Sequence, residues 1–317
     1  ALLIISGLIN WGAARWIIAA HDRQRQRKAI LVAGVAANLC ILGFFKYYGF
    51  FVEQLGGLLH QIGWQRDLPI LEIILPVGVS FFTFQGMSYL IDIYNRKTDD
   101  ACLLERTLLL SFFRPLVAGP LVGASHLIPH FNTVPTLTRS IVAAALGLII
   151  WGVFKKAVIA STLSIHFVDP VFFDPAAHGS LDLLLAAYGY AVQIYCDFSA
   201  YSDIAIGLAA LLGYRFPRNF DQPYRAASLQ DFWRRWHITL GDWLRNYLYF
   251  PLGGSRQGLP RTCLNLLLIM LIAGLWHGAA WGYVIWGGLH GIALAIHRLT
   301  EALSQQVRWL KSWWQSW

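Results

Sequence analysis

Residues 264–299 read LNLLLIMLIAGLWHGAAWGYVIWGGLHGIALAIHRL, and this stretch decides the fold class of the chain. It is 36 residues long with a single formal charge, at Arg298. A helix needs only about 20 apolar residues to cross the roughly 30 Å hydrocarbon core of a bilayer. The glycines spread along the stretch permit a break and a close approach of two helices. The stretch therefore predicts two membrane helices that meet near residues 274–278.

His277 lies at or just after that predicted bend. An ionisable side chain at this depth costs several kcal/mol unless a partner or a water-filled cavity receives it. No acidic residue lies within twenty positions on either side. Two interpretations are open: a packed histidine bonded to a backbone carbonyl that the glycine break frees, or a general base. A neutral imidazole can take the proton of a hydroxyl while the oxygen attacks an acyl carbonyl.

The composition places the whole chain in the membrane class. Hydrophobic residues make up 56% of its 317 residues and charged residues only 13%, at a mean hydropathy of +0.50. Soluble domains carry about 25% charged residues, so this chain lacks the charge to cover a water-facing surface. The net charge of +8 does not indicate a nucleic-acid partner, because the basic residues gather in short loops beside apolar runs. We expect an all-α, polytopic integral membrane protein in contact with membrane lipid.

The apolar runs predict an order of spans. We expect helices over residues 1–20, 29–52, 68–94 and 137–154, an outer loop at residues 53–67, and cytoplasmic segments at residues 21–28 and 95–106 and at Lys155–Lys156. Prolines break the window at residues 107–127, which predicts broken or re-entrant helices. Residues 165–182 are expected to form an outer loop.

The segment DFSAYSD at residues 197–203 is expected to interrupt the next apolar run. Asp197 and Asp203 point in different directions on a helix, which favours a helix break or a packing role over a shared-proton pair. His290 and His297 share a helical face, but no cysteine or carboxylate joins them, so we expect no metal site.

A dense aromatic and basic stretch begins at Ser228, which can cap a helix with Asp231 three residues on. The helical spacing of apolar residues predicts one amphipathic helix that lies in the membrane interface and ends at Pro251. His237 borders its apolar face. Arg234 and Arg235 on the same helix could bind the phosphates of a nucleotide-bearing donor. Contact with anionic lipid is at least as good an explanation for these arginines.

Residues 197–256 read DFSAYSDIAIGLAALLGYRFPRNFDQPYRAASLQDFWRRWHITLGDWLRNYLYFPLGGSR, and GLWHG follows at residues 274–278. This ordered set of motifs closely resembles the membrane-bound O-acyltransferase (MBOAT) family, in particular its bacterial polysaccharide, alginate-type O-acetyltransferase branch. The similarity covers roughly residues 68–299. It implies a multi-helix bundle around a central tunnel. The resemblance also implies that His277 is the catalytic histidine of the WHG motif. His237 would be the second invariant histidine of the family, placed at the tunnel mouth to orient a reactant.

The resemblance also implies an activity. An acetyl group would move from a cytoplasmic thioester donor across the bacterial inner membrane to an exopolysaccharide or a cell-wall glycan, with a periplasmic acetyltransferase as partner. Acetyl-CoA would be a substrate, and no bound cofactor is expected. Because family members commonly run beyond both ends of this chain, we expect residues 1–317 to be one transmembrane domain that is incomplete at both ends.

Two other classes of function fit the composition. A transporter or channel would also use interrupted helices and intramembrane histidines, but it should have two matching halves, and the sequence has no such internal symmetry. A non-catalytic scaffold of a polysaccharide export complex is the other alternative. The presence of both motif histidines, His237 and His277, argues against it.

Overall fold

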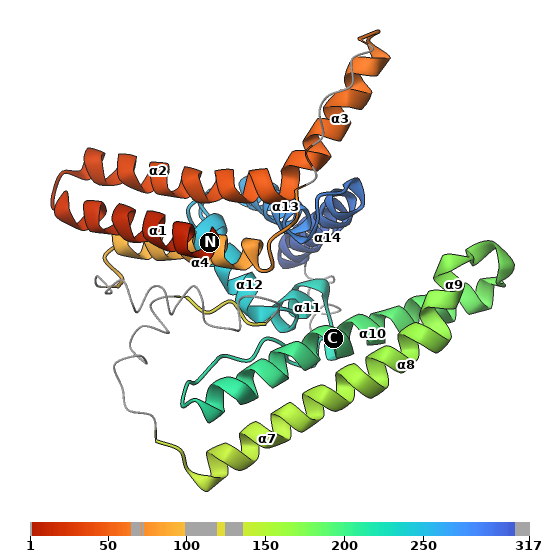
Figure 1. The fold of residues 1–317 in the computed structure, drawn as a ribbon. Helices are drawn as coiled ribbons and strands as arrows, with labels where there is room; N and C mark the ends of the chain where they lie inside the picture. Colours follow the sequence, from red (N-terminus) through yellow and green to blue (C-terminus); the bar gives the residue numbers. More distant parts are fainter. Residues whose placement is uncertain (1, 65–70, 72, 99–118, 124–135, 308–317) are drawn as a thin grey trace.

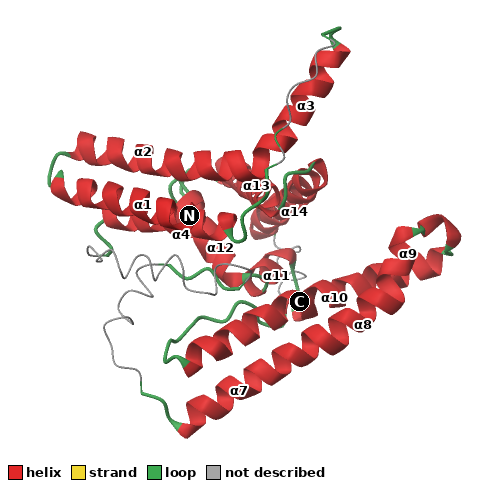
Figure 2. Ribbon diagram, viewed as in Figure 1, coloured by secondary structure: helices red, strands yellow, loops and turns green. Residues whose placement is uncertain are grey.

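The computed structural model describes residues 2–64, 71, 73–98, 119–123 and 136–307. Every regular element within these ranges is a helix (Figure 2). Five helical stretches are long and apolar enough to cross a bilayer: Leu2–Ala19, Gln24–Gln61, Arg139–Phe173, Ser180–Leu211 and Leu259–His277. The chain is a multi-pass membrane protein, and its predicted all-α class is confirmed. The broken helices predicted at residues 107–127 lie mostly outside the described residues.

Three N-terminal helices pack against one another: α1 (Leu2–Ala19), α2 (Gln24–Leu42) and α4 (Val79–Tyr94) (Figure 1). Buried amides join the first two, since Asn10 and Asn38 exchange hydrogen bonds of 3.2 and 2.9 Å. Such paired polar side chains hold helices together where lipid supplies no hydrophobic driving force. Gly86 of α4 leaves room for this pair, because a Cβ there would lie 2.5 Å from the Asn10 amide nitrogen.

The second helix is longer than predicted. It continues from α2 through a π-helical segment, η1 (Gly43–Tyr47), into α3 (Tyr48–Gln61), which projects away from the other helices (Figure 1). The outer loop predicted from residue 53 is therefore wrong for its first nine residues, which are helical. None of the residues of α3 is buried, so its exposed apolar side chains suit contact with lipid rather than a protein core.

A long helical hairpin forms a second group. Its first arm runs without a loop through α7 (Arg139–Phe154), η2 (Lys155–Ala160), α8 (Ser161–Leu163), η3 (Ser164–Val168) and α9 (Asp169–Phe173). A turn with a short 3₁₀ segment, η4 (Pro175–Ala177), leads to its second arm, α10 (Ser180–Leu211), and the arms lie side by side (Figure 1). The predicted helix end at Lys155–Lys156 is wrong, and so is much of the outer loop predicted at residues 165–182.

The two lysines are paired across the hairpin instead of facing the cytoplasm at a helix end. Lys155 Nζ lies 2.6 Å from Asp203 Oδ2 and also donates to Ser199 Oγ. Lys156 pairs with Asp197. Because α10 runs unbroken through DFSAYSD, the predicted interruption there is wrong, whereas the predicted packing role is confirmed. Each carboxylate of the motif neutralises one lysine of the facing arm.

The aromatic stretch after the hairpin forms several short helices rather than the predicted single one. A 3₁₀ turn, η5 (Pro223–Arg225), precedes α11 (Leu229–Arg235), α12 (Ile238–Leu244) and the π-helical η6 (Arg245–Tyr249). The predicted cap is confirmed, since Ser228 Oγ accepts from the backbone N–H of Asp231 at 3.1 Å. The break falls at His237, whose φ of 44° and ψ of 53° are left-handed and cannot continue an α-helix.

The stretch at residues 264–299 forms two helices, as predicted. The first, α13, spans Leu259–His277, and the second, α14, spans Trp281–Gln306. Their backbones approach closely at two glycines, because a Cβ at Gly274 would lie 2.2 Å from the carbonyl oxygen of Tyr283 and one at Gly287 would lie 2.3 Å from that of Met270. Small residues at such crossings let membrane helices pack backbone to backbone.

One buried cluster connects the N-terminal helices with α12 and α13. It takes side chains from the α2–η1 helix, α4, α12 and α13. Trp243 of α12 stacks on Phe84 of α4 at 4.0 Å between ring centroids, and its Nε1 donates to the Phe84 carbonyl oxygen at 3.2 Å. Trp276 near the end of α13 contacts the same Phe84 ring at 5.6 Å. The core thus fixes the end of α13, where His277 lies.

Candidate active site

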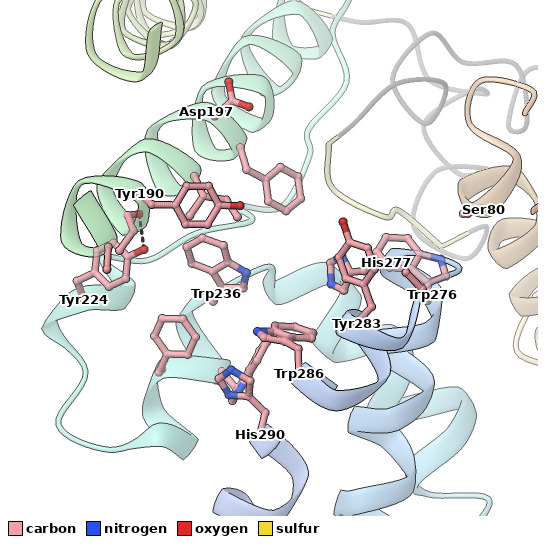
Figure 3. Close-up of a pocket in the computed structure, with 18 of the residues that line it drawn as sticks. Ser80, Tyr190, Asp197, Tyr224, Trp236, Trp276, His277, Tyr283, Trp286 and His290 are labelled. Atoms are coloured by element: carbon pink, nitrogen blue, oxygen red, sulfur yellow. Dashed lines mark hydrogen bonds between the residues drawn. The ribbon is translucent and has the colours of Figure 1, made fainter. Parts of the chain in front are cut away.

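A cavity of about 900 Å³ lies between α10, α11 and the adjoining ends of α13 and α14, and Lys46, Ser80 and Phe81 of the N-terminal helices complete its wall. Half of its twenty lining residues are Phe, Tyr or Trp (Figure 3). Aromatic faces give a wall that is apolar over most of its area, with polar groups at a few fixed points. Such a cavity suits an uncharged group that is oriented by a small number of hydrogen bonds.

His277 lines this cavity and remains accessible from it. It is the last residue of α13, and the next residue, Gly278, is fully extended at φ −165°. A Cβ on Gly278 would lie 2.2 Å from the Tyr283 ring, so glycine allows that ring to pack over the turn. The predicted position of the histidine at the helix break is confirmed, and the break is what turns its side chain toward the cavity.

Aromatic rings hold the His277 imidazole in place. Trp286 meets it edge to face at 5.3 Å between centroids, and Tyr283 stacks near it at 6.5 Å (Figure 3). No carboxylate among the described residues is hydrogen-bonded to the ring. A histidine in such surroundings remains able to accept a proton, since neither of its nitrogens is committed to an acid.

The end of α13 is fixed from outside by two neighbouring residues of η1. The Tyr47 hydroxyl donates to the carbonyl oxygen of Leu275 at 2.7 Å. Lys46 Nζ donates to the carbonyl oxygen of Trp276, the residue before His277. The last carbonyls of a helix lack partners within the helix and carry partial negative charge, so a hydroxyl and an ammonium satisfy them well. Sequence reasoning missed Lys46, although a lysine inside an apolar span is itself a signal of function.

His237 is buried next to the cavity rather than on its wall. Its side chain is 2% exposed and it is absent from the lining residues. The rings of Phe198 and Trp276, which do line the cavity, contact it at 4.7 and 6.1 Å. The two predicted histidines are therefore brought close together, with His277 open to the cavity and His237 one layer behind it.

A hydrogen-bond network fixes the tautomer of His237. Asn219 Oδ1 accepts from the backbone N–H of Thr239 at 3.3 Å, which identifies that atom as the amide oxygen, because a backbone N–H can only donate. The same oxygen lies 3.1 Å from His237 Nδ1, so Nδ1 carries the hydrogen and donates it. His237 Nε2 is left as a bare acceptor that is buried and has no partner among the described residues.

Burial lowers the pKa of His237 to about 3, so its imidazole is neutral at physiological pH. The network that holds it extends across the fold. Asn219 Nδ2 donates to Ser202 Oγ of α10 at 3.1 Å, and Thr239 Oγ1 accepts from the backbone N–H of Leu121 at 2.8 Å. Sequence reasoning missed Asn219, although it begins the NFDQPY motif of the quoted resemblance.

The two arginines predicted to hold donor phosphates do not reach the cavity. Arg235 is bonded to Asp231 at 2.9 Å and to the carbonyl oxygen of Asp221 at 3.4 Å. Their hydrogen bond raises the pKa of Arg235 and lowers the pKa of Asp231. Arg234 is exposed. Of their helix, it is Phe232 and Trp233 that line the cavity.

His290 and His297 have different surroundings. The His290 ring lines the cavity and packs edge to face against Trp233 and Trp286, at 5.2 and 4.9 Å. His297 is not among the lining residues. Within the described part of the chain, no group of three or more His, Cys, Asp or Glu side chains has a metal-binding arrangement.

Comparison with known proteins agrees with the motifs and the fold. Residues 103–317 match the model of the membrane-bound O-acyltransferase family, MBOAT. The chain belongs to this family. It is 41% identical over 302 residues, or 94% of its length, to a probable alginate O-acetylase, AlgI, of Pseudomonas aeruginosa. It is 39% identical to a peptidoglycan O-acetyltransferase of Helicobacter pylori, again over 94% of its length.

A more distant relative is the teichoic acid D-alanyltransferase of Bacillus subtilis, 25% identical over 260 residues and 78% of this chain. The matches span 57% of the Pseudomonas protein and 60% of the Helicobacter protein. The chain therefore corresponds to somewhat more than half the length of these relatives. The order of identities agrees with the predicted branch, since the acetyltransferases match better than the D-alanyltransferase.

Proposed function

We propose that this chain is the catalytic part of a bacterial inner-membrane O-acetyltransferase. An acetyl group would pass from a cytoplasmic thioester donor, with acetyl-CoA as the first choice, toward an exopolysaccharide such as alginate or a cell-wall glycan. The family match and the two acetyltransferases among its relatives support the reaction class. The observation that carries the proposal is His277, an uncommitted imidazole at a helix end that opens on a large aromatic cavity.

In the proposed reaction, His277 is the general base. Its free imidazole nitrogen takes the proton of the acceptor hydroxyl as that oxygen attacks the thioester carbonyl carbon. The tetrahedral intermediate then collapses, the C–S bond breaks, and the imidazolium returns its proton to the leaving thiolate. The products are an O-acetyl ester and a free thiol, so the base is regenerated in each turnover.

The charge of the cavity wall supports an uncharged entering group. Apart from the histidines, its formally charged residues are Lys46 and Asp197. Asp197 is paired with Lys156, whereas Lys46 is bonded to two neutral acceptors, the Trp276 carbonyl and Ser80. Among the described lining residues, a nucleotide would find one cation, Lys46, to balance several phosphate charges. The thioester arm of the donor would therefore enter, while the nucleotide stays outside, where exposed Arg234 remains a candidate contact.

His237 would have a supporting role in this reaction. Asn219 holds it in the tautomer whose Nε2 accepts hydrogen bonds, and its burial keeps it neutral. It would act indirectly, by holding the Phe198 and Trp276 rings that it contacts and that line the cavity. We place His237 among the reactant-positioning groups and His277 at the reacting atoms.

The names of the relatives bear on the acceptor of this proposed reaction. One relative is named for alginate and another for peptidoglycan, so related chains serve different glycans. A cavity with a mostly apolar wall has few groups that could bind and recognise a charged polymer. We therefore propose that a periplasmic acetyltransferase partner receives the acetyl group first and selects the glycan.

The test is release of free CoA from acetyl-CoA by the purified full-length protein in lipid nanodiscs, with and without a hydroxyl acceptor. His277→Ala should lower the rate about 10²–10⁴-fold, the usual contribution of a positioned general base. His297→Ala is the matched control, because this histidine lies on α14 outside the cavity. Normal turnover by His277→Ala would refute the assignment, and solute flux without donor cleavage would support a transporter instead.

A further inference from the structure

Lys46 occupies an unusual position for a lysine. It lies within the apolar helical stretch Gln24–Gln61, in the π-helical segment η1. A charged side chain within a membrane helix is costly and is found where a partner or an aqueous cavity receives it. Single π-helical turns are frequent at functional sites, since the extra residue turns side chains away from the regular helical direction. Both features indicate that this side chain is placed for a purpose.

The ammonium of Lys46 lies on the cavity wall with two acceptors assigned. One is the carbonyl oxygen of Trp276, and the other is Ser80 Oγ at 2.9 Å. A lysine ammonium has three N–H donors. The described residues take two of them, and Lys46 is itself a lining residue of the cavity, as is His277. The third N–H is available to a group bound beside His277.

Capping of α13 alone does not account for a charge at this point. Tyr47, the next residue of the same segment, satisfies the carbonyl of Leu275 with a neutral hydroxyl. A neutral donor could also satisfy the Trp276 carbonyl and would avoid the cost of burying an ammonium. What distinguishes position 46 from position 47 is the cavity, which Lys46 lines and Tyr47 does not.

We propose that Lys46 is the group that stabilises the oxyanion of acyl transfer, an inference that rests on the proposed function. As the acceptor oxygen attacks the thioester carbon and His277 takes its proton, the carbonyl π electrons move to the carbonyl oxygen. The third N–H of Lys46 donates to that oxygen. When the tetrahedral intermediate collapses, the carbonyl double bond reforms and the C–S bond breaks. The leaving thiolate is then protonated by the His277 imidazolium. Lys46 keeps its own protons throughout.

The matched variants are Lys46→Met and Tyr47→Phe, measured for kcat and KM of CoA release and for thermal stability. Each removes one side-chain donor from the end of α13, at adjacent carbonyls, but only the first removes a charge from the cavity. Loss of one oxyanion donor typically lowers kcat about 10²–10³-fold. We expect that loss for Lys46→Met with KM changed less than about threefold, and a loss below about tenfold for Tyr47→Phe.

Equal losses of kcat in the two variants would overturn the inference, because Lys46 would then act only as a cap. Lys46→Gln, which keeps a neutral N–H donor for the Trp276 carbonyl, is the second variant, and it should recover stability but little kcat. If both Lys46 variants fail to fold, the residue is structural and the inference is also overturned. A failure of the proposed function is distinguishable, since wild type would then release no CoA or His277→Ala would release it normally.

Discussion

Replacing Lys155 with methionine should destabilise this protein far more than the same change at its neighbour Lys156. The Lys155–Asp203 pair is 2.6 Å long, and the two side chains are only 7% and 23% exposed. Removing one partner of a buried pair leaves an uncompensated charge and costs about 3–5 kcal/mol. The Lys156–Asp197 pair is 42% and 39% exposed, and Asp197 lines the cavity. Pairs exposed to water contribute about 0–1 kcal/mol.

Thermal unfolding of the purified protein in detergent would measure the difference. At about 2 °C per kcal/mol for a chain of this size, Lys155→Met should lower the Tm by roughly 6–10 °C and Lys156→Met by less than about 2 °C. Adding Asp203→Asn to Lys155→Met should recover part of the loss, because no charge is then left without a partner. Equal shifts for the two lysines, or a double variant less stable than Lys155→Met, would refute the reasoning.

Two further predictions concern the interior. Because the folded pKa of His237, about 3, lies below the unfolded value of about 6.5, the unfolded chain binds a proton that the folded chain does not, and stability should fall as the pH decreases from about 6.5 toward 3. Asn219→Asp would stabilise the imidazolium and should reduce this fall in thermal scans between pH 7 and 4; an unchanged slope would contradict the account. Gly287→Ala should cost about 1–3 kcal/mol, since its Cβ would meet the Met270 carbonyl at 2.3 Å. Gly288→Ala, whose nearest contact is 3.6 Å away, should be tolerated, and equal melting temperatures would count against this interpretation.

The sequence was sufficient where the signal was local. The break between α13 and α14 was predictable because glycines and a histidine interrupt a run too long for one span. The same signal placed His277 at the turn. The family motifs named both histidines, but they could not tell which one would open on the cavity. That distinction depends on Phe198 and Trp276, whose rings separate His237 from the cavity in three dimensions.

The prediction of a helix end was wrong where the partners of the charged residues are distant in the sequence. Lys155 and Lys156 resembled the basic end of a membrane helix, which is the usual meaning of two lysines after an apolar run. Their partners Asp197 and Asp203 follow more than forty residues later, on the facing arm of the hairpin. In the sequence, these charges appear to end or interrupt helices. In the structure, the lysines and the carboxylates neutralise one another between the two arms.

Backbone conformation was the other source of error. The stretch after Ser228 has the apolar spacing of one amphipathic helix, yet it is divided at His237 by a left-handed residue. Only a few per cent of residues other than glycine adopt positive φ, so a histidine gave no warning of a break. Lys46 was overlooked for a different reason, because its partner carbonyl belongs to Trp276, at the opposite end of the chain.

The paired charges of the hairpin also bear on how the protein enters the membrane. A lysine near the centre of an inserting helix costs about 2.5–3.5 kcal/mol on the scale of the translocation machinery, so two adjacent lysines disfavour integration of Arg139–Phe173 alone. The carboxylates that neutralise them arrive only with Ser180–Leu211, after a connection of six residues, 174–179. We therefore expect the two arms to integrate into the membrane as one unit.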